Sequence, residues 1–153
     1  MARKDEAYVD TSALIALCDR SDTYHALFRR LFSDPPALVT TARVIGEGHA
    51  WVARRFAGTR GLRVLAMIDA LTPLRTGSGG RRELDAGVQL LQRYSDQRLT
   101  LADAVGLHVM ENRKIRSCWS TDRHLGLTGV PLVIHKGRAV HDRRVEQRQV
   151  AGR

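Results

Sequence analysis

Acidic side chains follow two apolar stretches of this chain at the points where those stretches end. Asp10 comes directly after the strand-like segment 7–9, and Asp122 follows the segment 115–120. In open parallel sheets, ligands bind beyond the carboxyl ends of the strands, so both acids are candidates for one site. An aspartate between a strand and a helix is also a preferred N-cap, which contributes about 1 kcal/mol. Each acid taken alone therefore fits a cap as well as a ligand.

Two further acids, Glu47 and Asp103, lie in segments with helical periodicity. Glu47 comes three residues after Val44 and four before Trp51, which places it on the same helix face as both. A lone carboxylate on an apolar face costs on the order of several kcal/mol unless it is neutralised, paired or bound to a metal. Asp103 could also be the N3 acid of a capping box that begins at Thr100. Its carboxylate can still point along the helix axis toward the strand ends.

The helix around Glu47 has unusual neighbours for a helix interior. Gly46 and Gly48 flank the acid, and each glycine costs about 1 kcal/mol relative to alanine at such a position. The pair is explained if another group approaches the helix backbone closely there. The alternative explanation for Glu47 itself is a buried ion pair with Arg43 or Arg54.

Carboxylates that share a pocket repel one another, and their pKa values rise unless a cation is present. Oxygen ligands suit hard cations, so these acids predict Mg²⁺ or Mn²⁺ and not zinc. Asp96 lies in a polar connection and is a tentative further acid, with an exposed loop position as the default. His124 follows Asp122 closely and could contact a phosphate, although a surface position is its default. Such ions lower the pKa of a bound water and stabilise the leaving oxygen of a phosphodiester.

The charge balance fits a polyanionic partner. The 153 residues include 25 Lys and Arg against 16 Asp and Glu, a net charge of +9. A field of this sign attracts nucleic acid, and solubility alone is the alternative explanation. Phosphate-binding glycine loops and a serine nucleophile elbow are missing from the sequence. The acids and the charge together predict metal-dependent cleavage of nucleic acid.

Length and composition predict one domain without a membrane segment. No apolar run reaches the roughly 20 residues that span a bilayer, and the first residues lack the apolar region of a signal peptide. Cys18 and Cys118 lie in apolar segments and fit reduced core residues better than a disulfide. We therefore expect a cytoplasmic protein.

Strand-like and helical patterns alternate along the chain, which predicts an α/β fold with parallel strands and right-handed crossovers. Residues 1–135 are expected to form the domain, and residues 136–153 a basic, mobile tail; a terminus without a role is the alternative. The expected strands are 7–9, 37–40, 73–74, 115–120 and 132–134. The expected helices are 11–20, 22–32, 41–56, 59–71, 81–93 and 100–113.

The order and spacing of the acidic motifs resemble PIN-domain nucleases, and most closely the VapC-type toxins of bacterial toxin–antitoxin pairs. The matching stretches are 9–14, Glu47, 96–104 and 120–125, so the resemblance covers about residues 7–135. It implies a PIN-like three-layer fold, with a twisted parallel sheet of about five strands flanked by helices. The acids that it implies for metal binding and catalysis are Asp10, Glu47, Asp103 and Asp122, with Thr11 and Ser120 in supporting positions and Asp96 where many relatives have a further acid.

The activity that the resemblance implies is that of a Mg²⁺- or Mn²⁺-dependent endoribonuclease, the toxin of a type II toxin–antitoxin pair. The implied partners are RNA, a cognate antitoxin that blocks the pocket, and a second copy of the chain in a homodimer. Two alternatives stay open: a PIN-fold RNA-processing nuclease without an antitoxin, and a non-catalytic RNA-binding module. Leu125 stands where relatives often have Phe, which is expected to alter packing beside Asp122.

Overall fold

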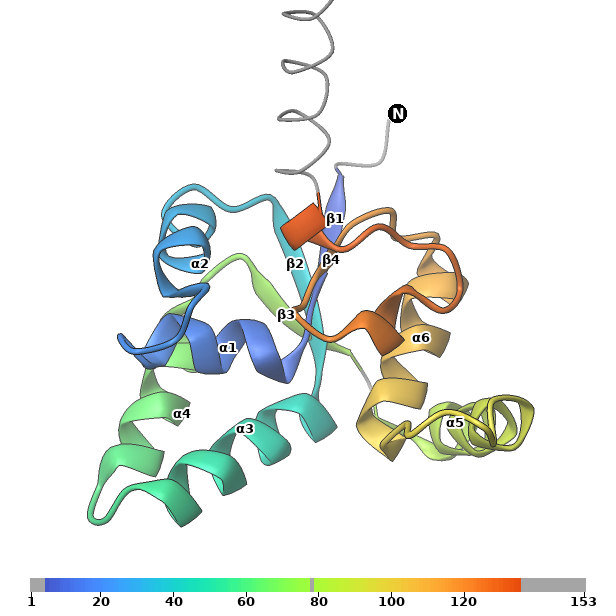
Figure 1. Ribbon diagram of the computed structural model, residues 1–153, viewed down its shortest axis with the longest axis horizontal. Coiled ribbons are helices and arrows are strands. Elements are labelled where there is room, and N and C mark those ends of the chain that lie inside the picture. Colours follow the sequence, from blue (N-terminus) through green and yellow to red (C-terminus); the bar gives the residue numbers. More distant parts are fainter. Residues whose placement is uncertain (1–4, 78, 136–153) are drawn as a thin grey trace, which may run out of the picture.

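A parallel sheet of 4 strands forms the centre of the computed structural model, which describes residues 5–77 and 79–135 (Figure 1). The strand order is β3-β2-β1-β4, and every pairing is parallel. The first strand of the chain is thus interior and pairs with the last one. The strands are β1 (Glu6–Val9), β2 (Ala37–Thr41), β3 (Leu74–Gly77) and β4 (Cys118–Trp119).

Helices cover both faces of the sheet, which gives three layers and confirms the expected fold class (Figure 1). The helices α1 to α4 lie on one side, and α5 and α6 lie on the other. Each expected helix is present with ends shifted by no more than a few residues, and the amphipathic 81–93 segment matches α5 at both ends. The helices are α1 (Thr11–Cys18), α2 (His25–Leu31), α3 (Ala42–Arg55), α4 (Arg60–Ala70), α5 (Arg81–Arg93), α6 (Leu101–Arg113) and the 3-10 helix η1 (Arg123–Gly126).

The fifth expected strand is reduced to a single bridge. Leu132 pairs in parallel with Cys118, and the backbone N–H of Cys118 donates to the carbonyl oxygen of Pro131 at 3.1 Å. Residues 133–135 have helical backbone, so the ladder ends after this one bridge. The expected tail, residues 136–153, lies outside the described residues.

The packing of Tyr8 on β1 against Gly106 on α6 determines how closely this helix approaches the sheet. Tyr8 is completely buried, and a Cβ atom added to Gly106 would lie 2.5 Å from the Tyr8 hydroxyl oxygen. A side chain at position 106 would therefore push α6 away from the sheet. Asp10 directly follows β1, and Asp103 lies in the first turn of α6. The contact between Tyr8 and Gly106 therefore brings the two acids toward each other.

The buried Tyr8 hydroxyl has no hydrogen-bond partner among the residues that the structure describes. The Thr41 side chain lies near the Tyr8 hydroxyl and favours its charged form. The two groups nevertheless do not meet the geometry of a hydrogen bond. Burial, followed by the nearby Asp10 charge, raises the pKa of Tyr8 far above its usual value. The hydroxyl is therefore neutral, and its missing partner costs stability.

The two cysteines, Cys18 and Cys118, are both free, as expected. Cys118 is buried within β4, whereas Cys18 is half-buried and its Sγ lies 3.5 Å from Met67 Sδ. Within residues 5–77 and 79–135, no helix combines the length and the apolar composition that crossing a membrane requires.

Candidate active site

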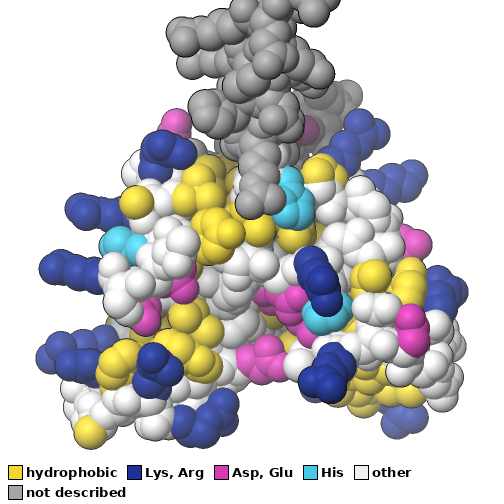
Figure 2. Space-filling model, viewed as in Figure 1, with side chains coloured by type: hydrophobic (Ala, Val, Ile, Leu, Met, Phe, Trp, Pro, Cys, Tyr) yellow, Lys and Arg dark blue, Asp and Glu magenta, His cyan; other side chains and the backbone are white. Residues whose placement is uncertain are grey.

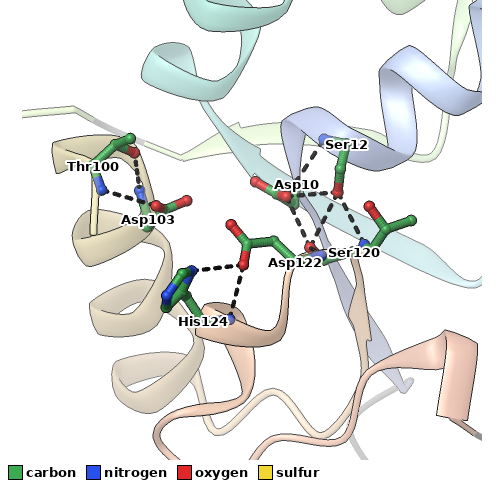
Figure 3. Close-up of polar contacts among 8 residues, drawn as sticks. Asp10, Ser12, Thr100, Asp103, Ser120, Asp122 and His124 are labelled. Carbon is green, nitrogen blue, oxygen red and sulfur yellow. Dashed lines mark hydrogen bonds and ion pairs between the residues drawn. The ribbon is translucent and has the colours of Figure 1, made fainter. Parts of the chain in front are cut away.

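Asp10 stands between β1 and α1, and its side chain caps the helix. Its Oδ2 accepts hydrogen bonds from the Ser12 backbone N–H at 3.4 Å, from Ser12 Oγ at 2.8 Å and from Ser120 Oγ at 2.8 Å (Figure 3). The two serine hydroxyls lie 3.1 Å apart, and the Thr121 backbone N–H donates to Ser12 Oγ at 3.0 Å. This network links the carboxyl ends of β1 and β4. It leaves Asp10 Oδ1 without a hydrogen bond from any described residue.

Asp122 is the N-cap of η1 and is held in a similar way. Its Oδ1 accepts a hydrogen bond from the His124 backbone N–H at 2.9 Å and another from the His124 ring Nδ1 at 2.8 Å. Its own backbone N–H donates to Ser120 Oγ at 2.9 Å. Within the described part of the chain, Asp122 Oδ2 receives no hydrogen bond.

Asp103 closes the expected capping box at the start of α6. The Thr100 backbone N–H donates to Asp103 Oδ2 at 2.9 Å, and the Asp103 backbone N–H donates to Thr100 Oγ1 at 3.1 Å. Asp103 as a whole residue is only 7% exposed. Burial raises the pKa of Asp103, the bond from Thr100 opposes this, and the charges of Asp10 and Asp122 raise it further. Asp10 and Asp122 are thus N-caps, Asp103 completes a capping box, and the charges of the other two acids act on Asp103.

The three aspartates converge on one space between the sheet end and α6. Figure 3 shows the carboxylates of Asp10, Asp103 and Asp122 turned toward one another across this space. Figure 2 shows acidic side chains gathered in a hollow at the centre of the same face, with basic side chains nearby. As they stand, no three His, Cys, Asp or Glu side chains of residues 5–77 and 79–135 are grouped tightly enough to hold a metal ion.

Glu47 contacts the site through Thr11. Thr11 Oγ1 donates to Glu47 Oε2 at 3.2 Å and lies 3.4 Å from the carbonyl oxygen of Val44. The buried residues of α3 are Val44, Gly48 and Val52, so the half-buried Glu47 lies at the edge of the buried face. Solvent therefore reaches this carboxylate, and its placement is less costly than the sequence suggested.

The alternatives for the helix around Glu47 receive mixed support. Within the described residues, no ion pair joins Glu47 to Arg43 or Arg54. A Cβ atom on Gly48 would lie 3.7 Å from Thr11 Cγ2, which is an ordinary contact. A Cβ atom on Gly46 would have nothing within 4 Å. The hypothesis that both glycines admit a close neighbour is therefore wrong for Gly46.

The remaining candidate residues have simpler surroundings. Asp96 is exposed and accepts a hydrogen bond from Gln97 Nε2 at 2.8 Å, as a loop acid would. Leu125 is completely buried in η1, close in sequence to Asp122. Sequence reasoning missed Ser12 and did not foresee the bond from His124 to Asp122. Both lie two residues after an aspartate, and this spacing is typical of local side-chain to backbone turns.

Residues 7–129 match the family described as PIN domain. Ribonuclease VapC26 of Mycobacterium tuberculosis is 29% identical over 116 residues, which span 75% of this chain and 85% of that protein. The 23S rRNA-specific endonuclease VapC20 of the same organism is 28% identical over 123 residues, which span 80% of this chain and 93% of that protein.

Two solved structures resemble this fold. The crystal structure of M. tuberculosis VapC20, described as a sarcin–ricin loop cleaving toxin, has a TM-score of 0.74 at 24% identity and covers 82% of this chain and 96% of its own. PAE2754 from Pyrobaculum aerophilum has a TM-score of 0.59 at 21% identity and covers 84% of this chain and 91% of its own. Both likenesses concern the fold alone.

Proposed function

The chain belongs to the PIN domain family, and from this membership and the geometry of the acidic site we propose that it is an endoribonuclease of the toxin type. The observation that carries the proposal is the convergence of Asp10, Asp103 and Asp122 at the end of a parallel sheet. Each carboxylate is anchored through one oxygen and keeps the other without a described donor. The names of the two relatives, a ribonuclease and an rRNA-specific endonuclease, support RNA as the substrate class.

We further propose that these acids bind Mg²⁺ or Mn²⁺. The donor set consists of carboxylate oxygens, which hard divalent cations prefer. Burial and the neighbouring acids already raise the pKa of Asp103, and a cation would relieve that repulsion. When bound, such an ion supplies an activated water and stabilises charge on a phosphodiester. Glu47 is the fourth candidate ligand, positioned by Thr11.

The protein's own groups orient the acids and attract the substrate. The hydroxyls of Ser12 and Ser120 fix Asp10, and the capping box fixes Asp103 at the start of α6. The net charge of +9 favours association with a polyanion.

Cleavage of RNA in Mg²⁺ or Mn²⁺, with and without EDTA, tests this function. We expect cleavage that requires metal, and Asp122→Asn should abolish it. Asp85→Asn is the matched control, because it makes the same charge change on α5 in an exposed ion pair with Arg81. Cleavage that persists in EDTA, or an Asp122→Asn variant as active as the wild type, would contradict the mechanism.

We also propose a small antitoxin protein as the partner. A groove of about 750 Å³ between α1, α3 and α4 offers a surface for it. Three arginines and one acid, Asp19, line the groove beside apolar side chains, and this balance fits an amphipathic segment that carries acidic side chains. The apolar lining includes Leu17, Trp51, Phe56 and Met67, and the arginines are Arg20, Arg60 and Arg63.

A tagged chain should co-purify with a small protein that stops cleavage. An active chain that captures no such protein would favour the alternative of an RNA-processing nuclease. The expected homodimer stays a prediction, which sedimentation of the purified chain would check.

A further inference from the structure

His124 makes two hydrogen bonds to a single carboxylate oxygen. Both its backbone N–H, at 2.9 Å, and its ring Nδ1, at 2.8 Å, donate to Asp122 Oδ1. Because a carboxylate oxygen accepts, Nδ1 must carry the proton, and this holds for the neutral ring and for the charged one. The His124 side chain is 21% exposed, and that of Asp122 is 36% exposed. The bond is therefore partly shielded from water.

The carboxylate of Asp122 is held differently from the other two acids. Asp10 Oδ2 is fixed by the hydroxyls of Ser12 and Ser120, which belong to the ends of two strands. Ser120 reaches only the backbone N–H of Asp122 and not its carboxylate. Among the described residues, His124 is the sole donor to this carboxylate.

A single backbone donor would leave the Asp122 carboxylate free to turn about that bond. The ring of His124 adds a donor from a second direction to the same oxygen, so the plane of the carboxylate is fixed. Oδ1 is then fully engaged, and Oδ2 is the atom left for the space shared with Asp10 and Asp103 (Figure 3).

We propose that His124 is a positioning residue that turns Asp122 Oδ2 toward the metal-binding space through its Nδ1–H. This inference rests on the proposed function, since it takes Asp122 as a metal ligand. Residues that orient metal ligands from behind typically contribute about 10–100-fold in metal affinity or activity. His124 needs no contact with the ion or with RNA to have this effect.

Calorimetric titration of Mn²⁺ into the RNA-free full chain tests the role of His124. The variants His124→Ala, His124→Asn and His124→Gln separate the two ring nitrogens. An asparagine amide can lie where Nδ1 lies, whereas a glutamine amide reaches toward the position of Nε2. We expect His124→Ala and His124→Gln to bind Mn²⁺ about 10–100-fold more weakly. His124→Asn should stay close to the wild type.

Cleavage assays give a second readout. At saturating Mn²⁺, His124→Ala should regain most of the wild-type rate, because the ligands themselves are intact. A rate that stays low at every Mn²⁺ concentration would instead place His124 against RNA and overturn the positioning role. Circular dichroism checks that the variants fold. If His124→Ala does not fold, the comparison of His124→Asn with His124→Gln carries the test.

The outcomes distinguish this inference from the proposed function. A wild-type chain that binds no Mn²⁺ would contradict the metal-dependent function itself. Wild-type binding that His124→Ala leaves unchanged would overturn only the role of His124. If His124→Asn bound Mn²⁺ as weakly as His124→Ala, the positioning role would also be overturned, because an amide donor at the Nδ1 position should be enough to orient Asp122.

Discussion

The acidic rim of the site and the packing beneath it are held together by opposite kinds of contact. Asp10, Asp103 and Asp122 are oriented mainly by residues two or three positions away in the chain. Two residues before Asp10, Tyr8 packs against Gly106 of α6, a residue distant in sequence. The rim is therefore built mainly from local turns, which the bond from Ser120 to Asp10 joins across two strand ends, and the floor is built from long-range packing.

This difference separates chemistry from stability. Changes at the rim remove charged groups that do not pack in the apolar core. They should therefore alter function and leave the fold intact. Changes in the floor disturb close packing that involves two layers of the structure, so they should unfold the protein before they alter its chemistry. Three changes test this separation, and the largest effect is expected at the rim.

Asp10→Asn should reduce RNA cleavage by at least about 100-fold, which is typical for the loss of a group that stabilises charge in a transition state. The asparagine keeps an oxygen that can accept from Ser12 and Ser120, so the free energy of unfolding should change little. Cleavage rates and urea unfolding of the same sample measure both quantities. If Asp10→Asn lowers stability as strongly as it lowers activity, the rim is not separate from the fold.

Gly106→Ala should destabilise the protein by about 1–3 kcal/mol, the usual cost of overpacking. The added Cβ would lie 2.5 Å from the buried Tyr8 hydroxyl oxygen. In the same assays, the double variant with Tyr8→Phe should recover part of this loss, because the hydroxyl that clashes and lacks a partner is gone. Urea unfolding of the single and double variants measures the coupling.

Gly46→Ala is the matched control for the floor, because nothing lies within 4 Å of its added Cβ. Alanine is the better helix former, so this variant should be more stable than the wild type by about 1 kcal/mol. If Gly46→Ala and Gly106→Ala lowered the free energy of unfolding by similar amounts, contact with Tyr8 would not explain the destabilisation at position 106.

The raised pKa of Asp103 gives the smallest expected effect, and it depends on pH. The folded protein holds this proton more tightly than the unfolded chain, so ionisation lowers stability as the pH rises from 3.8 through the folded pKa. Asp103→Asn cannot ionise and should unfold at a higher temperature than the wild type at pH 7 without metal. The gain should shrink at pH 3. Thermal unfolding in EDTA at pH 3 and pH 7 measures this gain. The same difference in unfolding temperature between Asp103→Asn and the wild type at both pH values would show that burial of the charge is unimportant.

The sequence predicted the layers and the converging aspartates because both leave periodic or positional signals. Apolar periodicity located the helices α1 to α6 but not η1, and the strand-to-helix positions of Asp10 and Asp122 located the end of the sheet. The capping alternatives were not rivals of the ligand role, since one carboxylate has two oxygens and can serve both. Whether one carboxylate can fill both roles could not be decided from residue types alone.

Other features depended on packing that a sequence does not display. The expected strand at 132–134 stops after one bridge at Leu132, because residues 133–135 are helical. The exposure of Glu47 depends on where α3 meets α1. The bond from His124 to Asp122 depends on a ring rotamer within η1. The exposure of Glu47 arises only when elements distant in sequence meet, whereas the bond from His124 to Asp122 is local and depends on the rotamer that the ring adopts.

The strand order has a consequence for the synthesis of the chain. β1 emerges early but occupies an interior place in the sheet, beside β4, which is made more than a hundred residues later. Ser120, which donates to Asp10, and Asp122 both follow β4 in the chain. A polypeptide that ends before β4 lacks both Ser120, which fixes Asp10, and Asp122, so the three aspartates come together only once nearly the whole described chain has been made.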